Sequence, residues 1–404
     1  MEPKIRFKGF TGEWEEKPLL DVVTLYNGLT YTPNDIRDRG TLVLRSSNVQ
    51  EGEISLLDNV YVRSEVATSP NVEKGDIIIV VRNGSRALIG KHAQIKTDMP
   101  NTVIGAFMAG MHTDEPEFMN ALLCTSRFDN EVTINLGATI NQITNGTFRS
   151  MDFLFPDKKE QKALGSYFQH LNSLIQSTTK KIESLKQVKA ASLQSMFPQV
   201  GETKPRVRFK GFEGEWEKVT LDDCLIINNE RNQNNAYGIN DVLSVSDEVG
   251  VVNQIKLLGR SYAGKSVSNY RVLKTNQIVY TKSPLKSKPY GIVKVNKGSV
   301  GIVSVLYAVY DTKENVCPDY IHYYFEPTHR INNYLLPLIN KGAKNTMNIS
   351  DEMALTGSIW IPSYKEQEKI AEYMQSLDSQ ISLQTLRLEK LKQIKSACLD
   401  NMFV

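Results

Sequence analysis

The chain repeats itself, and this duplication constrains its fold more than any other feature. Residues 3–15 read PKIRFKGFTGEWE and residues 205–217 read PRVRFKGFEGEWE, at an offset of 202 residues. A second block, FPDKKEQ at 155–161, returns as IPSYKEQ at 361–367, at an offset of 206 residues. The period is far longer than the roughly 20–50 residues of a solenoid repeat. We therefore interpret the chain as a tandem duplication of a domain with an appended element.

The offset of 206 residues continues to the end of each copy. LKQVK at 185–189 matches LKQIK at 391–395, and Met-Phe at 196–197 matches Met-Phe at 402–403. The stretches between the matched blocks show little mutual similarity. A shared framework with divergent interiors favours two domains with one architecture and two specificities.

The appended elements are predicted to be long helices. Apolar residues recur in steps of three and four, which is the heptad seam of a coiled coil. Each helix covers about 38 residues, or ~57 Å at 1.5 Å per residue. The predicted seam consists of Leu164, Phe168, Leu171, Ile175, Ile182, Leu185 and Val188 in the first copy and of Ile370, Met374, Leu377, Ile381, Leu388, Leu391 and Ile394 in the second.

Neither helix has a globular domain of its own to bury its seam in this interpretation, so we expect the two helices to pair with each other. An antiparallel pairing would hold the two domains apart at opposite ends. Two independent homodimeric coiled coils are the alternative.

The domain interiors mix strand-like and helix-like segments. Short β-rich runs lie at 41–44, 76–81, 277–280 and 301–307, and helical segments are expected at 116–127 and 318–336. The predicted class is α+β, with two globular domains separated by a pair of long antiparallel coiled-coil helices. The predicted ranges are 1–150 and 201–358 for the globular domains, and 151–200 and 359–404 for the helical spacers.

Composition excludes several classes of protein. No apolar run approaches the ~18–20 residues of a membrane span, and no apolar segment of a signal peptide follows the first residues. We therefore expect a cytoplasmic protein with no membrane partner. The four cysteines and five histidines lack metal-ligand spacing, so we expect no disulfide framework and no metal site, and assign these residues to core or surface packing.

Charge is distributed unevenly. Residues 1–150 carry 15 Lys+Arg against 19 Asp+Glu, whereas residues 205–360 carry 19 against 15. From Val249 to Tyr310 there is no acidic residue among ten basic residues and six interleaved tyrosines. A surface that faces phosphates excludes carboxylates and keeps bases, so this window favours a nucleic-acid surface. A solvated basic face without a partner is the alternative.

One motif suggests catalysis. GRSYAGKS at 259–266 fits the phosphate-binding loop pattern. Such a loop needs a helix that begins at its Lys-Ser, but the residues that follow, VSNYRVL, favour a strand. We therefore interpret Lys265 as a phosphate-facing base. No dinucleotide-binding glycine motif, no methyltransferase Asn/Asp-Pro-Pro-aromatic tetrapeptide and no nuclease cluster is present, which predicts a non-catalytic chain.

The duplicated order of blocks resembles the specificity subunit of type I restriction–modification enzymes. The blocks that carry the resemblance contain Trp14 and Trp216, the two Pro-x-x-x-Glu-Gln segments at 156–161 and 362–367, and the Leu-Lys-Gln-x-Lys helices. The segment YTKSPLKSKPYG at 280–291 is also similar to a stretch of that family's recognition domains.

The resemblance implies two target-recognition domains that each read one half of a split, asymmetric site on double-stranded DNA. It implies that the helices fix the gap and dock two methyltransferase subunits, which carry restriction–translocation subunits. S-adenosylmethionine, ATP and Mg²⁺ would then belong to those partners, and this chain would need no cofactor. The alternatives are a non-catalytic coiled-coil interaction scaffold without DNA specificity and a nucleotide hydrolase that uses residues 259–266.

Candidate DNA contacts are polar or basic residues that follow β-like runs or lie in turns, from where side chains reach base edges and phosphates. In the first domain these are Arg45, Ser46, Asn48, Arg82, Asn83, Ser85, Arg86, Lys91, Asn141, Gln142 and Thr144. In the second they are Ser244, Ser246, Lys265, Lys282, Ser283, Lys286, Lys288, Tyr290, Lys344, Asn345 and Thr346. Local capping is the alternative role for each. Joint replacement of Lys282, Lys286 and Lys288 is expected to weaken DNA binding and flatten its salt dependence.

Overall fold

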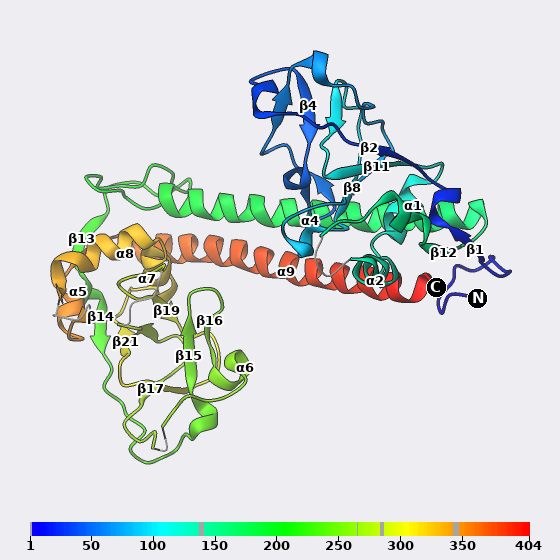
Figure 1. The fold of residues 1–404 in the computed structure, drawn as a ribbon. Coiled ribbons are helices and arrows are strands. Elements are labelled where there is room, and N and C mark those ends of the chain that lie inside the picture. The colour runs from blue at the N-terminus through cyan, green and yellow to red at the C-terminus, as the bar shows by residue number, and fades with distance from the viewer. Residues whose placement is uncertain (1, 137–140, 265, 283–286, 342–346) are drawn as a thin grey trace. The chain divides into compact units, whose positions relative to one another are not determined.

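The structure is a computed structural model that describes residues 2–136, 141–264, 266–282, 287–341 and 347–404 (Figure 1). The chain divides into two compact units. The first contains Met1–Lys180 with Thr385–Val404, and the second contains Lys181–Gln384. The end of the chain therefore belongs to the same unit as its beginning.

Two four-stranded sheets form the body of the first unit. One has the order β2-β11-β8-β9 and is antiparallel throughout, and the other has the order β10-β4-β7-β3 with a parallel β10–β4 pair. Their strands are β2 (Thr24–Asn27), β11 (Met108–His112), β8 (Ile77–Val80), β9 (His92–Gln94), β10 (Thr102–Ile104), β4 (Thr41–Leu44), β7 (Val60–Val62) and β3 (Ile36–Arg37). Every residue of β8 is buried, as expected for a run of β-branched residues in a central strand.

Short elements complete the first unit. They are the paired strands β1 (Glu15–Pro18) and β12 (Asp152–Phe155), the paired strands β5 (Val49–Gln50) and β6 (Glu53–Ile54), and the helices α1 (Pro116–Leu122), α2 (Ser126–Asn135) and α3 (Asn145–Arg149). Single 3-10 turns lie at Leu19–Asp21, Pro33–Asp35, Ser46–Asn48, Ser64–Val66 and Arg86–Leu88.

The second unit repeats the antiparallel sheet of the first. Its sheet β14-β21-β18-β19 matches β2-β11-β8-β9 in order and direction. These strands are β14 (Leu225–Ile227), β21 (Ala308–Thr312), β18 (Ile278–Tyr280) and β19 (Val293–Val295). The pair β13 (Glu217–Thr220) and β24 (Ser358–Ile361) likewise matches β1 and β12. The structure therefore reproduces the duplication that the framework blocks predict.

The other elements of the second unit are shorter. They are the strand pairs β15 (Leu243–Ser246) with β16 (Gly250–Asn253), β17 (Arg271–Leu273) with β20 (Gly301–Val303) and β22 (Asn340–Lys341) with β23 (Met347–Asn348), the helices α5 (Leu221–Cys224), α6 (Gln254–Leu258), α7 (Pro318–Phe325) and α8 (Thr328–Leu335), and 3-10 turns at Ile239–Asp241, Leu336–Leu338 and Met353–Leu355.

Two long helices, α4 (Lys158–Ser195) and α9 (Tyr364–Met402), confirm the predicted helical elements (Figure 1). Their lengths of 38 and 39 residues agree with the periodicity. Asp157 accepts a hydrogen bond from the backbone nitrogen of Glu160 at the start of α4, 2.9 Å long, which satisfies one of the free donors of the first turn.

Within each unit, the start of one long helix lies against the end of the other. In the first unit the Tyr167 hydroxyl lies 3.3 Å from the Cys398 sulfur. In the second unit Ser192 lies 3.3 Å from the Tyr373 hydroxyl. Both contacts join an early position of one helix to a late position of the other, which is the pattern of the predicted antiparallel pairing.

The predicted seam residues from Leu164 to Leu185 and from Ile370 to Leu391 are all buried or partly buried, whereas Val188 and Ile394 are exposed. The expectation that no globular domain buries the seam is wrong. Leu164 and Phe168 belong to the core of the first unit, and Ile370, Met374 and Leu377 belong to the core of the second. The first turns of each helix follow β12 and β24 directly in the chain and pack in the core of the domain that precedes them.

The helix ends are exchanged between the two copies of the repeat. Phe403, at the end of the second copy, packs edge-on against Trp14 of the first copy, with ring centroids 6.2 Å apart. Phe197, at the end of the first copy, packs edge-on against Trp216 of the second copy at 6.3 Å. Each domain core is therefore completed by the helix of the other copy.

Candidate nucleic-acid interface

Three polar loops meet in the first unit, although they lie far apart in the sequence. The Asn83 side-chain amide donates a 3.1 Å hydrogen bond to the Ser46 hydroxyl. The backbone of Arg82 forms an isolated β-bridge with Gln142, and the Asn141 side chain donates to the Gly84 carbonyl at 3.2 Å. The structure thus brings together residues that the sequence analysis placed in three separate candidate segments.

An exposed aromatic residue borders these loops. Phe107 connects β10 to β11 and leaves 52% of its surface exposed. The exposed Arg82 guanidinium lies over its ring, 5.2 Å from the centroid, and the Arg82 backbone nitrogen donates to the Phe107 carbonyl at 3.2 Å. An exposed arginine stacked on an aromatic ring offers a charge for phosphates and a flat surface for bases. Sequence reasoning missed Phe107 because it lies in the apolar run TVIGAFMAGM, which predicts burial.

Several other candidates of the first unit have structural partners. Asn48 is fully buried and donates to the carbonyls of Ser55 and Asp58 at 2.8 and 3.1 Å, so it holds a turn instead of facing solvent. Arg45 pairs with the Asp58 carboxylate at 2.8 Å. Thr144 caps α3 by accepting a hydrogen bond from the Thr147 backbone.

The remaining candidates of the first unit are exposed. Arg86 donates to the Leu136 carbonyl at 3.0 Å but keeps an exposed side chain, and Ser85 and Lys91 are exposed as well. With Arg82, these side chains provide positive and hydrogen-bonding groups on the loops that follow β8.

The basic window of the second unit is not one continuous phosphate-facing surface. The Lys282 amine lies 2.6 Å from the Asp351 carboxylate, and the buried Arg271 guanidinium lies 2.6 Å from the other oxygen of the same carboxylate. Lys288 is also buried, donates to the Glu326 carbonyl at 2.5 Å and lies 3.4 Å from Asp247. The charges of Lys282 and Lys288 therefore point inward.

The acid-free stretch hides this arrangement because its acidic partners lie outside it in the sequence. Lys294 is buried near Asp247, 3.6 Å away, and burial lowers the pKa of its amine. Lys274 and Lys297 lie 2.6 Å from Glu230 and Asp319, respectively. Local charge counts miss such long-range pairs. Burying an unpaired charge is costly, which accounts for the acidic neighbour of Lys294, whereas Lys274 and Lys297 are half exposed.

Another part of the same window is exposed. Arg260 and Tyr262 lie on the loop that follows α6, where the guanidinium sits 4.6 Å from the ring centroid. Tyr262 leaves 61% of its surface exposed. This second arginine–aromatic pair has the same chemistry as Arg82–Phe107. Arg260 and Tyr262 belong to the acid-free basic window, but the sequence does not distinguish these exposed residues from the bases of the window that point inward.

The other candidates of the second unit are partly buried or outside the described residues. Ser244 accepts a hydrogen bond from the Gln254 side chain, and Ser246 accepts from the backbone of Glu248 in the β15–β16 turn. Tyr290 is partly buried. Lys265, Ser283, Lys286, Lys344, Asn345 and Thr346 lie outside the described residues.

The pattern GRSYAGKS does not have the setting of a nucleotide-binding loop. Gly259 ends α6 in the left-handed conformation, with φ of 75°, so the helix precedes the pattern. The described residues after Lys265 form no helix before β17. A phosphate-binding loop presents its amides from a helix that follows, and that helix is absent from this part of the described chain.

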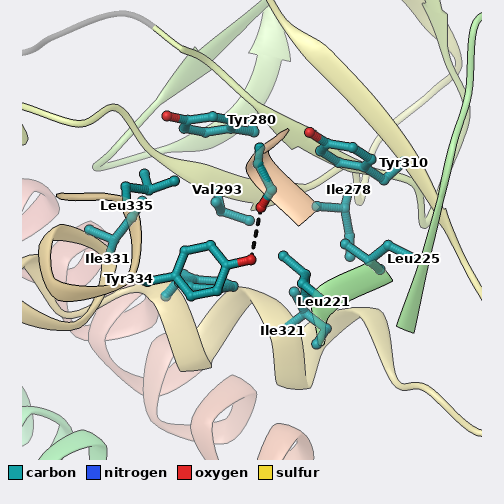
Figure 2. Close-up of a pocket in the computed structure, with 12 residues that line it drawn as sticks. Leu221, Leu225, Ile278, Tyr280, Val293, Tyr310, Ile321, Ile331, Tyr334 and Leu335 are labelled. Atoms are coloured by element: carbon teal, nitrogen blue, oxygen red, sulfur yellow. Dashed lines mark hydrogen bonds between the residues drawn. The ribbon is translucent and has the colours of Figure 1, made fainter. Parts of the chain in front are cut away.

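A cavity in the second unit is also too small for a ligand. It lies between the β14-β21-β18-β19 sheet and helices α7 and α8, and apolar side chains and tyrosines line it (Figure 2). Tyr334 donates to the Ala354 carbonyl at 2.8 Å across its edge. Its volume of about 20 Å³ is that of a packing void.

Two absences concern only the residues that the structure describes. Among them, no group of three or more His, Cys, Asp or Glu side chains is arranged to hold a metal ion. None of the described helices combines the length and apolar character that crossing a bilayer requires.

Comparison with known proteins gives a consistent result. Residues 11–187 match the family model of the type I restriction modification DNA specificity domain. The chain is 22% identical over 414 residues to the type I restriction enzyme StySPI specificity subunit of Salmonella potsdam, covering 94% of this chain and 87% of that one. It is 23% identical over 410 residues to the EcoKI specificity subunit of Escherichia coli K12, with the same coverage.

A solved structure shares the fold. The S subunit of a type I restriction-modification system from M. genitalium has a TM-score of 0.63 to this chain at 12% identity, covering 100% of this chain and 99% of that one.

Proposed function

We propose that the whole chain is the DNA-recognition subunit of a type I restriction–modification enzyme, with one half of a split site read by each unit. Residues 11–187 match the model of that family's DNA specificity domain. The similarity to specificity subunits runs over 94% of the chain. The repeated sheet order supports two recognition domains of one architecture.

The observation that carries the assignment of contacts is the presence of one exposed arginine–aromatic pair in each unit. Arg82–Phe107 borders the loops that contain Ser46, Asn83 and Gln142, and Arg260–Tyr262 follows α6. Amide and hydroxyl groups beside an exposed guanidinium are the groups that read base edges in a groove. The different residues in the two units would give two different half-sites.

The remaining parts of the proposal concern partners. The paired helices α4 and α9 would set the gap between half-sites and dock two methyltransferase subunits, through which restriction–translocation subunits join. S-adenosylmethionine, ATP and Mg²⁺ would be bound by those partners. This chain would take part in no bond-making step of methylation or restriction, so its contribution to those reactions is to position the methyltransferase on its target.

The test has two stages. Methylome sequencing of cells that express the chain with its methyltransferase, compared with the methyltransferase alone, should reveal a split motif that depends on the chain. Binding of the purified complex to a duplex of that motif is then measured against salt concentration. The same methylation pattern with and without the chain would contradict the proposal. Weak DNA binding that does not depend on salt would also contradict it, and is what an interaction scaffold without DNA specificity predicts.

Variants separate the two half-sites. Arg82→Ala should weaken binding and relax selection in one half of the motif, and Arg260→Ala should do so in the other half. Each should cost about 1–3 kcal/mol if the guanidinium contacts a base, or reduce the salt slope by about 1 if it contacts a phosphate. Arg82→Lys and Arg260→Lys are matched controls that keep the charge and remove the planar stacking group.

A further inference from the structure

A cysteine and a histidine of the first unit form a close pair that the proposed function does not use. The Cys124 sulfur, between α1 and α2, lies 3.5 Å from the Nε2 atom of His92 on β9. The His92 Nδ1 atom lies 3.1 Å from the Gly90 carbonyl. A carbonyl only accepts, so Nδ1 carries the proton in this contact and the lone pair of Nε2 faces the thiol. His92 is thus oriented as a base toward Cys124.

Cys124 lines a pocket of about 290 Å³. Its lining includes Cys124, Asn120 on α1 and Lys392 and Lys395 on α9, all within the first unit. The Asn120 side chain is about nine-tenths buried, and its Oδ1 atom has no hydrogen-bond partner among the described residues. A buried acceptor without a partner is costly, so a water or another small hydrogen-bond donor beside Asn120 would stabilise this site.

We propose that Cys124 and His92 form a thiolate–imidazolium pair at which a small hydroperoxide oxidises Cys124. The thiolate sulfur attacks one oxygen of the peroxide, so that an S–O bond forms and the O–O bond breaks. Cysteine is oxidised to a sulfenic acid, and the peroxide is reduced to water or an alcohol, whose leaving oxygen takes the proton of the His92 imidazolium. Asn120, which lines the same pocket, carries an amide oxygen that could accept a hydrogen bond from the peroxide O–H after a side-chain rotation.

The charges around the sulfur agree with this chemistry. Burial opposes the thiolate, but the hydrogen bond and positive charge of His92, together with Lys395, lower the pKa of Cys124. Burial opposes the imidazolium of His92, but the hydrogen bond and charge of Cys124, with the backbone carbonyls of Gly90 and Asn120, raise the pKa of His92. Asp129 acts against the thiolate. Glu51 and Glu53 also line the pocket, and Glu53 forms an ion pair with Lys96.

The chain contains its own reference thiols. Cys224 and Cys317 are buried, and burial raises the pKa of Cys224 to about 11 and also raises that of Cys317. Cys398 lies beside the Tyr167 hydroxyl. The four cysteines lie far apart in the sequence, so digestion of the labelled full chain separates them for mass spectrometry.

The experiment measures alkylation of the folded full chain by iodoacetamide from pH 5.5 to 9.5, resolved by cysteine. Cys124 is expected to react at least tenfold faster than Cys224 and Cys317 at pH 6.5, and His92→Gln is expected to move its reactivity profile to higher pH. Lys395→Gln, on the long helix, should cause a smaller shift in the same direction and provides a second variant if His92→Gln unfolds. The proposal would be overturned if the pH dependence of Cys124 alkylation were that of an ordinary thiol and were the same in both variants.

Oxidation is tested separately. The chain is treated with hydrogen peroxide in the presence of dimedone, which traps sulfenic acids. A dimedone adduct at Cys124 that falls at least fivefold in His92→Gln is expected, and Asn120→Asp, which places a negative charge beside the thiolate, should slow its formation. Absence of the adduct at Cys124 in the wild-type chain would refute the hydroperoxide reaction. The result is independent of DNA binding, so it stands or fails apart from the proposed function.

Discussion

The guanidinium of Arg208 binds the carboxylate of Glu366 through two hydrogen bonds of 2.6 and 2.7 Å. Arg208 belongs to the first framework block of its copy and Glu366 to the second. Arg6 and Glu160 make the same paired contact in the first unit, with both hydrogen bonds 2.7 Å long. The framework blocks are alike in both copies because each pair of blocks interlocks through one buried carboxylate.

Glu366→Gln is expected to destabilise the second unit by about 3 kcal/mol, because the substitution leaves a guanidinium without its charged partner in a largely buried position. Chemical denaturation of the full chain measures this change. Arg206→Ala is a matched control, since Arg206 pairs with Glu202 four residues away and keeps 64% of its side chain exposed; it should have little effect. Equal effects of the two variants would show that the buried pair has no special role.

Phe403→Ala should loosen the first unit, although residue 403 is almost 400 positions from its N-terminal block. Removal of this buried ring from its contacts with Trp14, Phe118 and Phe168 is expected to cost about 3–5 kcal/mol. Phe197→Ala should have the same effect on the second unit. Hydrogen exchange followed by mass spectrometry locates the loss of protection, and the exposed Val200→Ala is the control. Loss of protection in the wrong unit would contradict the exchange of helix ends.

Lys282→Met should lower stability without changing the salt dependence of DNA binding. The Lys282 amine lies against Asp351 together with Arg271, so its removal leaves that buried carboxylate with one cation fewer. Arg260→Ala provides the contrast, because an exposed base is expected to reduce the salt slope while stability stays the same. A lower slope for Lys282→Met would mean that this amine faces phosphate after all.

A pH effect is expected at His112. Its Nδ1 atom lies 3.0 Å from the buried Asp76 carboxylate, and this hydrogen bond raises the pKa of His112. A raised pKa in the folded state means that the pair stabilises the fold fully below the ordinary value of 6.5 and loses its contribution as pH rises through the higher folded value. Between pH 5 and 9, the free energy of unfolding of the wild-type chain should therefore fall more steeply with pH than that of the His112→Gln variant. Parallel curves would contradict the coupling.

The sequence predicted the framework more successfully than the site. The helices at 158–195 and 364–402 follow from heptad periodicity, and the strand at Thr41–Leu44 follows from its apolar run. The packing partner of Phe403 could not be predicted from the sequence. Its ring contacts Trp14 only because two helices that are distant in the sequence pair with each other.

The contact residues divide along similar lines. Residue type predicts Asn83, Ser46 and Gln142 as contacts, and these residues are close together in the structure. The same criterion predicts Asn48 and Lys288, which are buried. Residue type predicts which chemistry a side chain can perform, whereas long-range partners such as Asp247 and Glu326 decide whether it faces solvent.

The exchange of helix ends has a consequence for synthesis on the ribosome. Phe168 is in place early, but the ring that packs against it, Phe403, emerges 235 residues later. At ~5–20 residues per second, the N-terminal domain would wait on the order of tens of seconds for the last piece of its core. The two halves, although copies of each other, therefore do not mature in the order in which they are translated. The half that is translated first is completed last.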